Sequence, residues 1–325
     1  MYFGKRIRGM SRIGLAFEAG LAKPSEKTVL LHPDVNFDVT NLSNVLIVEP
    51  FFPSNIAWQN KGYCCKVSLP YKPFELAIVC CTRSRQQTSD LIAQASAQAD
   101  LVVVDGQKVD GIEAHYKLLR KLVEIKGNVT KGHGRLFWFS SADLSNLRAT
   151  PQSFNNFTTI AGVFSANAVD QGSELLAAAL PENLRGDVAD FGAGWGFLSS
   201  KILNYQSVIS LDLIEADATA LEYAKLNIKD PRANFHWDDA TAWNGSYDAI
   251  IMNPPFHKGR LGNPDLGRAF IINAARCLRP KGDLWMVANR HLPYENVLNQ
   301  CFENVSEILG NSQFKLFHSS RPKRK

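Results

Sequence analysis

Apolar residues in the first half of the chain recur with two different periods. Short β-branched runs predict strands, and they alternate with longer segments that have an apolar residue every three or four positions, as in a helix. The predicted strands are Val45–Val48, Leu76–Cys81, Leu101–Val104 and Arg135–Phe139, and the predicted helices are Gln86–Ala99 and Gly111–Ile125. This alternation predicts an α/β fold. No glycine-rich turn joins a strand to a helix here, so this half has the outline of a nucleotide-binding fold without its cofactor-binding turn.

The same alternation is more regular after Val188. The predicted strands are Val188–Phe191, Val208–Ile214, Asn234–Trp237, Ala249–Met252 and Asp283–Val287, and the predicted helices are Phe197–Leu203, Ala218–Ile228 and Leu266–Leu278. This order predicts a doubly wound parallel sheet, whose ligands bind at the carboxyl ends of its strands. The polar segment Ser140–Ala161 has no sustained period and is the expected linker. We therefore expect one domain over residues 1–150 and a second over residues 160–325.

Composition and length narrow the class of protein. The chain has 325 residues, of which 45% are hydrophobic and 21% charged, so a disordered chain and a single small module are excluded. No apolar run approaches the roughly 20 residues that span a bilayer. The basic first dozen residues are not followed by the apolar stretch of a secretory signal. The six cysteines form no CxxC pair, which predicts reduced thiols, a cytoplasmic protein and no metal site.

Charge is unevenly distributed between the halves. Residues 1–150 contain 19 Lys and Arg against 13 Asp and Glu, a net charge of +6, whereas residues 151–325 contain 17 against 18, a net charge of −1. A basic half beside a neutral half suggests a polyanionic partner held mainly by the first domain. A solvated basic surface without a partner is an equally good interpretation of the charge alone.

The segment Asp190–Gly196 (DFGAGWG) stands where a predicted strand turns into a predicted helix. Glycines at such a turn let backbone amides approach a ligand at the helix N-terminus. A dinucleotide-binding GxGxxG pattern would need glycine where the chain has Phe197, and an acidic residue before the first glycine would repel a pyrophosphate. The pattern favours instead a cationic cofactor, S-adenosylmethionine (SAM). A turn that only packs strand against helix is the alternative. The candidate cofactor-binding residues are Asp190, Gly192, Gly194 and Gly196.

Acidic residues follow the next two predicted strands. Glu215 ends the strand about twenty residues after the glycines, where a carboxylate accepts hydrogen bonds from the ribose hydroxyls of either NAD or SAM. Asp212 is the rival acid, but it lies inside the strand. Asp239 is expected to accept a hydrogen bond from the adenine amino group, with helix capping as the alternative.

Asn253-Pro254-Pro255-Phe256 directly follows the strand Ala249–Met252. Two consecutive prolines continue neither a strand ladder nor a helix interior, so they form a stiff turn at the carboxyl edge of the sheet. The Asn253 Oδ1 atom and the Pro254 carbonyl oxygen can accept hydrogen bonds from an exocyclic amine of a base and hold its lone pair toward a methyl donor. Phe256 can stack on that base. We predict that Asn253, Pro254 and Phe256 are catalytic and that Pro255 contacts the substrate.

Three basic residues follow this turn. We expect His257, Lys258 and Arg260 to bind the substrate, because a loop histidine beside Lys and Arg more often contacts phosphate than transfers a proton.

The second half resembles the bacterial ribosomal-RNA guanine-N2 methyltransferases of the RsmC/RlmG type, which are class I SAM-dependent enzymes. The matching residues are Gly162–Ser165, Asp170, Gly172, Ser173, Leu175, Leu176, Asn253–His257, Gly259, Val287–Asn289, Leu292–Tyr294 and Phe314–Leu316. The resemblance implies two tandem methyltransferase-fold domains, of which the N-terminal one is degenerate, supports the fold and holds RNA. It also implies that Gly162–Asp170 closes over the methionine end of SAM, with Asp170 in the cofactor site. Lys258 departs from the family, which often has an acidic or small residue there.

These observations predict methyl transfer from SAM to a guanine N2 amine of 16S ribosomal RNA, by a cytoplasmic monomer that needs neither a metal nor a membrane. Methylation of guanine N2 or adenine N6 in 23S ribosomal RNA or transfer RNA is an alternative, because all these amines suit the same turn. Glutamine methylation of a release factor usually uses tyrosine at the position of Phe256. A non-catalytic RNA-binding protein that kept the fold is the alternative from another class.

Overall fold

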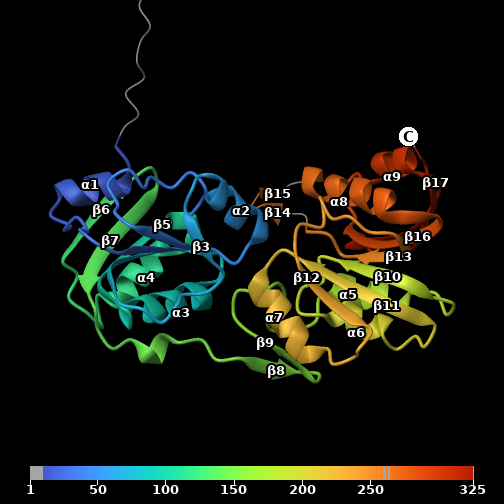
Figure 1. The fold of residues 1–325 in the computed structure, drawn as a ribbon, viewed down its shortest axis with the longest axis horizontal. Coiled ribbons are helices and arrows are strands. Elements are labelled where there is room, and N and C mark those ends of the chain that lie inside the picture. The colour runs from blue at the N-terminus through green and yellow to red at the C-terminus, as the bar shows by residue number, and fades with distance from the viewer. Residues whose placement is uncertain (1–9, 256, 259–260, 263, 325) are drawn as a thin grey trace, which may run out of the picture. The chain divides into compact units, whose positions relative to one another are not determined.

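The computed structural model describes residues 10–255, 257–258, 261–262 and 264–324. The described chain forms two compact units. The first unit contains the residues up to 50 and residues 54–150, and the second contains residues 51–53 and the chain from 151 onward. Each unit is built on one seven-stranded sheet with helices on both faces (Figure 1).

The first unit has the strand order β3-β2-β1-β4-β5-β7-β6. Its strands are β1 (Thr28–Leu31), β2 (Val45–Val48), β3 (Cys64–Lys66), β4 (Phe74–Cys80), β5 (Ala99–Gln107), β6 (Gly127–Lys131) and β7 (Gly134–Ser140). Its helices are α1 (Arg12–Glu18), α2 (Phe52–Asn60), α3 (Arg85–Ser96), α4 (Ile112–Leu119) and the short 3-10 turns η1 (Lys108–Asp110) and η2 (Ser145–Leu147). The strands from β3 to β5 are parallel, whereas β7 is antiparallel to both of its neighbours.

The second unit has the strand order β12-β11-β10-β13-β16-β18-β17. The strands of this sheet are β10 (Gly186–Phe191), β11 (Val208–Glu215), β12 (Ala233–Trp237), β13 (Tyr247–Met252), β16 (Leu278–Asn289), β17 (Phe302–Gly310) and β18 (Phe314–Pro322). Its helices are α5 (Gln171–Ala178), α6 (Phe197–Ile202), α7 (Ala218–Asn227), α8 (Pro264–Cys277) and α9 (Glu295–Cys301). Two short hairpins pair β8 (Gln152–Phe154) with β9 (Phe157–Thr159) and β14 (His257–Lys258) with β15 (Leu261–Gly262).

The two sheets have the same topology when their strands are matched in order, from β3 and β12 at one edge to β6 and β17 at the other. This confirms the predicted fold class of two tandem methyltransferase-like domains. The purely parallel sheet predicted for the second half is wrong at one edge, because β18 runs antiparallel to β16 and β17. The β17–β18 hairpin adds these strands, and adjacent strands joined by a short turn must be antiparallel.

The core of the second unit follows the period-2 alternation of its central strands. Ala189 and Phe191 of β10 pack against α8 and α9, whereas Val188 on the same strand packs with α5, α6 and α7 on the opposite face. Successive strand residues point to opposite faces of a sheet, so both faces of β10 are apolar and both are covered.

Two local predictions are wrong for reasons of tertiary packing. The helix expected over Gly111–Ile125 ends at Leu119, and Val123 and Ile125 reach the core from the following loop. Part of the expected linker forms the β8–β9 hairpin. Phe154 and Phe157 of this hairpin pack against Trp195, with ring centroids 5.7 and 5.0 Å apart.

Candidate active site

The glycine turn after β10 requires backbone that only glycine adopts freely. Gly192, Gly194 and Gly196 have φ angles of +76°, +57° and +93°. A Cβ atom at Gly194 would meet nothing within 4 Å, so the turn is open on this side. Gly196 is the N-cap of α6, which places the turn at a helix N-terminus. The turn therefore has the geometry expected of a cofactor cradle.

Asp190 lies behind this turn and is fully buried. Its Oδ2 atom accepts a hydrogen bond of 2.6 Å from Ser199 Oγ, and its Oδ1 atom has no hydrogen-bond partner among the described residues. Burial raises the pKa of Asp190 to about 7, because the charged form is poorly solvated. A buried acceptor without a partner is unusual in a native fold and is consistent with a ligand or water that completes the site.

Glu215, at the end of β11, is tied to the glycine turn. Its Oε2 atom accepts a hydrogen bond of 2.7 Å from the Gly194 amide, and its Oε1 atom accepts one of 2.7 Å from the Asp217 amide. Burial raises the pKa of Glu215 to about 7. The rival Asp212 lies within β11 and accepts a hydrogen bond of 2.7 Å from the Tyr247 hydroxyl. Glu215 is therefore the acid that reaches the carboxyl edge of the sheet.

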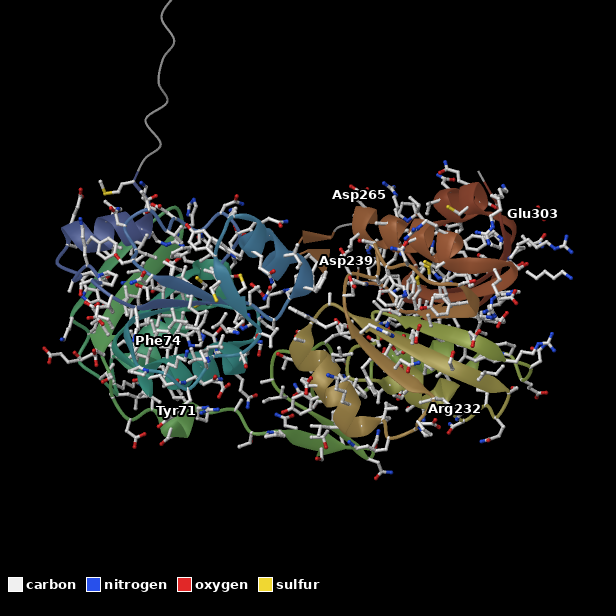
Figure 2. The ribbon with its side chains drawn as sticks, viewed as in Figure 1. Tyr71, Phe74, Arg232, Asp239, Asp265 and Glu303 are labelled. Carbon is white, nitrogen blue, oxygen red and sulfur yellow. The ribbon has the colours of Figure 1, made fainter. Side chains whose placement is uncertain are left out.

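Asp239, labelled in Figure 2, follows β12 and closes a local turn. Its Oδ1 atom accepts hydrogen bonds from the Thr241 amide (2.8 Å) and hydroxyl (2.7 Å). This capping contact is the alternative that the sequence left open. The predicted adenine contact of Asp239 stays a prediction.

Asn253 is the first residue after β13, and its side-chain amide is held in one orientation. The Nδ2 atom donates hydrogen bonds of 2.8 Å to Asp170 Oδ2 and of 2.8 Å to Ser173 Oγ. Both hydrogens of the amide are thereby used, and Oδ1 accepts no hydrogen bond from a described residue. Pro254 is buried and Pro255 is exposed. The stiff turn thus presents a fixed acceptor at the carboxyl edge of the sheet.

Asp170 has a second role in the same network. It is the N-cap of α5, and its Oδ2 atom accepts a hydrogen bond of 2.9 Å from the Ser173 amide. The capping bond fixes the carboxylate that in turn fixes Asn253. The sequence predicts Asp170 only as a cofactor residue and predicts no role for Ser173. An Asp three residues before a Ser at the start of an apolar run is the signal for this cap.

One cavity brings four of the predicted site residues together. Asp170, Gly192, Gly194 and Asn253 line it, together with Phe164, Ser165, Ser173, Ala193, Trp195, Phe197 and Leu198. The Trp195 Nε1 atom donates a hydrogen bond of 2.9 Å to the Phe164 carbonyl oxygen, so the segment before α5 lies over the glycine turn. Asp190, Gly196, Glu215 and Asp239 do not line this cavity. Lys258 and His257 belong to β14, and Phe256 and Arg260 lie outside the described residues.

Comparison with known proteins gives the same assignment as this geometry. Residues 154–318 match the methyltransferase small domain family. The ribosomal RNA small subunit methyltransferase C of Shewanella sp. (strain MR-4) is 33% identical over 243 residues, which cover 70% of this chain and 71% of that protein. The chain belongs to the ribosomal RNA small subunit methyltransferase C family. It is therefore an RNA methyltransferase by family.

Other members of this family match a larger part of the chain. The ribosomal RNA small subunit methyltransferase C of Psychromonas ingrahamii is 28% identical over 261 residues and covers 75% of each chain. A solved structure of the T. thermophilus 16S rRNA N2 G1207 methyltransferase, in complex with AdoMet and guanosine, has a TM-score of 0.78 and 22% identity. It covers 94% of this chain and 90% of its own, so the family fold includes both units. No helix among the described residues is both long enough and apolar enough to cross a bilayer.

Proposed function

We propose that this protein transfers a methyl group from SAM to the exocyclic N2 amine of a guanine in 16S ribosomal RNA. The observation that carries the proposal is the Asn253 amide, whose two hydrogens are used by Asp170 and Ser173 and whose Oδ1 atom is left as an acceptor beside the glycine turn. The names of the relatives and of the similar structure support the nucleotide and the RNA.

The residues of the second unit fit SAM. The open glycine turn lines the cavity and would hold it, and the Asp190 and Glu215 carboxyls lie behind this turn, where Glu215 accepts the Gly194 amide. When bound, the cofactor supplies a methyl group on a sulfonium, which is electrophilic without a metal. The Phe164–Ser165 segment would cover the methionine end, as the family resemblance implies.

The chain's own part in the reaction is to orient the amine. Asn253 Oδ1 and the Pro254 carbonyl oxygen would accept one hydrogen bond each from the N2 amine. This arrangement turns the lone pair of the amine toward the methyl group. The new N–C bond would form as the bond between the methyl group and sulfur breaks, with its electron pair left on sulfur. The nitrogen would then lose one hydrogen as a proton, which is released to water. Fixed acceptors of this kind act by proximity and preorganisation, so a strong general base is not needed to begin the attack. Phe256 is proposed to stack on the base.

The first unit has the same strand order but not the same turn. We propose that it supports the fold and contributes to RNA binding, with the domain boundary near residues 150–160. The protein would act as a monomer in the cytoplasm, where its RNA substrate is found.

The test is methylation of defined RNAs by the purified protein with isotope-labelled SAM. Unmodified 16S ribosomal RNA, assembled small subunits, 23S ribosomal RNA and transfer RNA are offered separately, and the products are digested to nucleosides. We expect N2-methylguanosine in 16S ribosomal RNA, free or assembled, and in neither of the other RNAs. N6-methyladenosine, or label only in transfer RNA, would overturn the proposal. Absence of SAM binding by titration would leave only the binding-protein alternative.

A further inference from the structure

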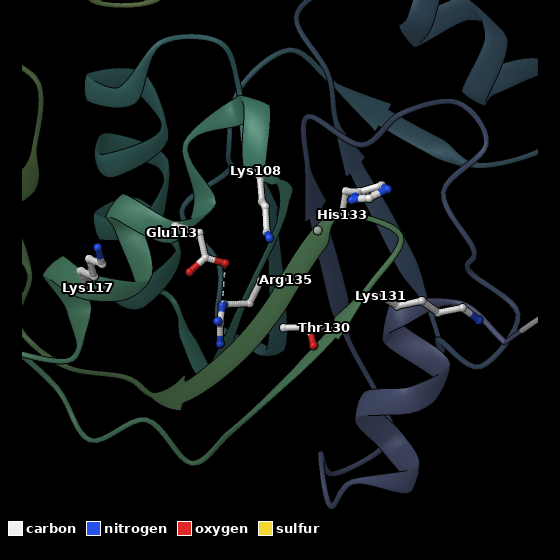
Figure 3. A pocket seen from close by; sticks show the side chains of 8 residues that line it. Lys108, Glu113, Lys117, Thr130, Lys131, His133 and Arg135 are labelled. Carbon is white, nitrogen blue, oxygen red and sulfur yellow. Dashed lines mark hydrogen bonds and ion pairs between the residues drawn. The ribbon is translucent and has the colours of Figure 1, made fainter.

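The first unit contains a basic pocket that the proposed reaction does not use. It is a cavity of about 570 Å³ lined by Lys108, Lys117, Lys131, Arg135, His133 and Glu113, with Thr130 and Gly134 (Figure 3). We call it the basic pocket. Its lining contains four permanent cations and one carboxylate. Among the residues that the structure describes, Lys108 and Lys117 form no ion pair.

The basic pocket is not a remnant of the cofactor site. In the second unit the cofactor cavity lies over β10 and β13, whose counterparts in the first unit are β1 and β4. The basic pocket lies instead beside β5, β6 and β7, the last three strands toward one edge of the sheet. A ligand of this pocket would therefore be distinct from the cofactor.

Arg135 is held in place at the floor of the pocket. Its Nε atom donates a 3.0 Å hydrogen bond to Glu113 Oε1, and its Nη1 atom donates one of 2.6 Å to Asn128 Oδ1. The guanidinium also lies 4.1 Å from the centre of the Tyr116 ring. Nη2 donates to no described residue. Arg135 and Glu113 neutralise each other's charge, and the Nη2 hydrogens of Arg135 remain available to a ligand.

The walls of the pocket are also fixed. The Lys108 amide donates a 3.0 Å hydrogen bond to the His133 carbonyl oxygen, which ties η1 to the turn between β6 and β7. Lys131 Nζ donates to the Met10 carbonyl oxygen, and in Figure 3 the Lys131 and Lys117 side chains point away from the centre of the pocket. Cations from η1, α4 and the β6–β7 hairpin therefore line one cavity, in which Lys108 and Arg135 lie at the centre and Lys117 and Lys131 at the edges.

The lining selects a class of ligand. It offers cations and hydrogen-bond donors, whereas its carboxylate is paired with Arg135 and one face of the Tyr116 ring lies under that guanidinium. No aromatic side chain other than the His133 ring is among the described lining residues, so the pocket offers little surface on which a base could stack. Several cations spread over a wide cavity suit a chain of phosphates better than a single phosphate.

We infer that the basic pocket binds the phosphodiester backbone of the substrate RNA without reading its sequence. This inference rests on the proposed function for the identity of the RNA. The pocket increases the affinity of the enzyme for its RNA and does not take part in the chemical step.

The test is the salt dependence of RNA binding by a triple variant, Lys108→Gln, Lys117→Gln and Lys131→Gln, in the full chain. The probes are fluorescent transcripts of 16S ribosomal RNA and of an unrelated single-stranded RNA. Because each lost phosphate contact lowers the slope of log K against log salt by about 0.7 to 0.9, the slope should fall by about two to three on both probes. We also expect KM for RNA to rise about tenfold or more, with kcat unchanged.

The matched control is Lys27→Gln, Lys66→Gln and Lys72→Gln, which removes the same charge from exposed lysines of the first unit outside the pocket. Its slope should equal that of the parent. Equal slopes for all three proteins, or equal losses in both triple variants, would overturn the inference. Binding of the pocket variant is also measured to assembled small subunits. If the variant lost binding to subunits but bound free RNA like the parent, the inference would be overturned, because the ligand would then be a protein surface. A parent that methylates no RNA would overturn the proposed function instead, whatever the slopes.

Discussion

The two units share one scaffold and differ at the carboxyl edge of the central strands. Leu31 of β1 pairs with Val48 and Val79, as Phe191 of β10 pairs with Ile214 and Met252. One residue beyond these rows, the first unit has His32, Glu49 and Cys80 where the second has Gly192, Glu215 and Asn253. The sheet and the acidic residue are thus kept, whereas the residues at the positions of Gly192 and Asn253 are changed.

The changed residues close the first unit against ligands. His32 keeps the left-handed backbone of Gly192, with φ of +53°, but puts an imidazole where the cofactor turn is open. Burial lowers the pKa of His32 to about 4. Nearby, Arg12 of α1 pairs with the buried Asp105 at 2.5 Å, so these polar groups satisfy each other. In the second unit Asp190 Oδ1 and Asn253 Oδ1 are left without a partner among the described residues. The second unit therefore has two side-chain acceptors that no described residue satisfies at the carboxyl edge of its central strands, one behind its open glycine turn and one beside it.

The largest expected effect comes from replacing Asn253, the residue after β13 that the first unit lacks. Asn253→Ala removes the fixed acceptor and should lower kcat by about 100- to 1000-fold, as loss of one preorganised hydrogen bond does in other sites. The Kd for SAM should stay within about twofold, because Asn253 faces the amine. Cys80→Ala, at the matching position of β4, is the control and should leave kcat unchanged. A parent-like rate for Asn253→Ala in the methylation assay would refute the assigned role.

A smaller effect is expected at β11. Glu215→Gln keeps the side-chain size but replaces one of the oxygens that accept the Gly194 and Asp217 amides with a donor. Loss of a charge-assisted hydrogen bond of about 1.5 to 3 kcal/mol should raise the Kd for SAM by about tenfold or more, measured by calorimetry. Glu49→Gln in the first unit should leave this Kd unchanged. Equal effects of the two variants would mean that Glu215 acts only through general stability.

A moderate loss of rate is expected from the residues that orient Asn253. Ser173→Ala removes one of the two acceptors of Nδ2, so the amide turns more freely. A neutral hydrogen bond of about 1 kcal/mol predicts a fall in kcat of about three- to tenfold, with KM unchanged. In the Asn253→Ala background the same substitution should have no further effect on kcat. An additive loss in the double variant would show that Ser173 acts independently of Asn253.

Local sequence was sufficient to predict the turns that carry the candidate site residues but not the contacts between them. The glycine turn, Glu215 and the Asn253 turn could be predicted, because each depends on spacing within one strand and the residues after it. The link from Asp170 and Ser173 to Asn253 could not, because it joins residues about 80 positions apart. The sequence also did not predict β3, because a three-residue strand is too short for a periodic signal, or β1, although β2 of the same length was predicted.

The last expected effect is on stability rather than on catalysis, and it concerns the buried acid of the second unit. Because burial raises the pKa of Asp190 from 3.8 to about 7, the folded chain keeps a proton on this carboxyl over a pH range in which the unfolded chain releases it. The stability contributed by this group is therefore complete below pH 3.8 and falls as the pH rises toward about 7. The amide side chain of the variant Asp190→Asn does not titrate. Without SAM, the free energy of unfolding of the variant minus that of the parent should therefore rise between these two pH values and stay constant above them.

The measurement is urea unfolding of parent and variant at several pH values from 4.5 upward to about 8, a range chosen to bracket the folded pKa. The control is Asp187→Asn. The hydrogen bond from Arg279 lowers the pKa of Asp187, so this acid is ionised in the folded chain throughout the range and its difference from the parent should stay nearly flat. A flat difference for Asp190→Asn as well would mean that the buried carboxyl is already ionised, and that its Oδ1 atom is solvated through a path that the fold does not reveal.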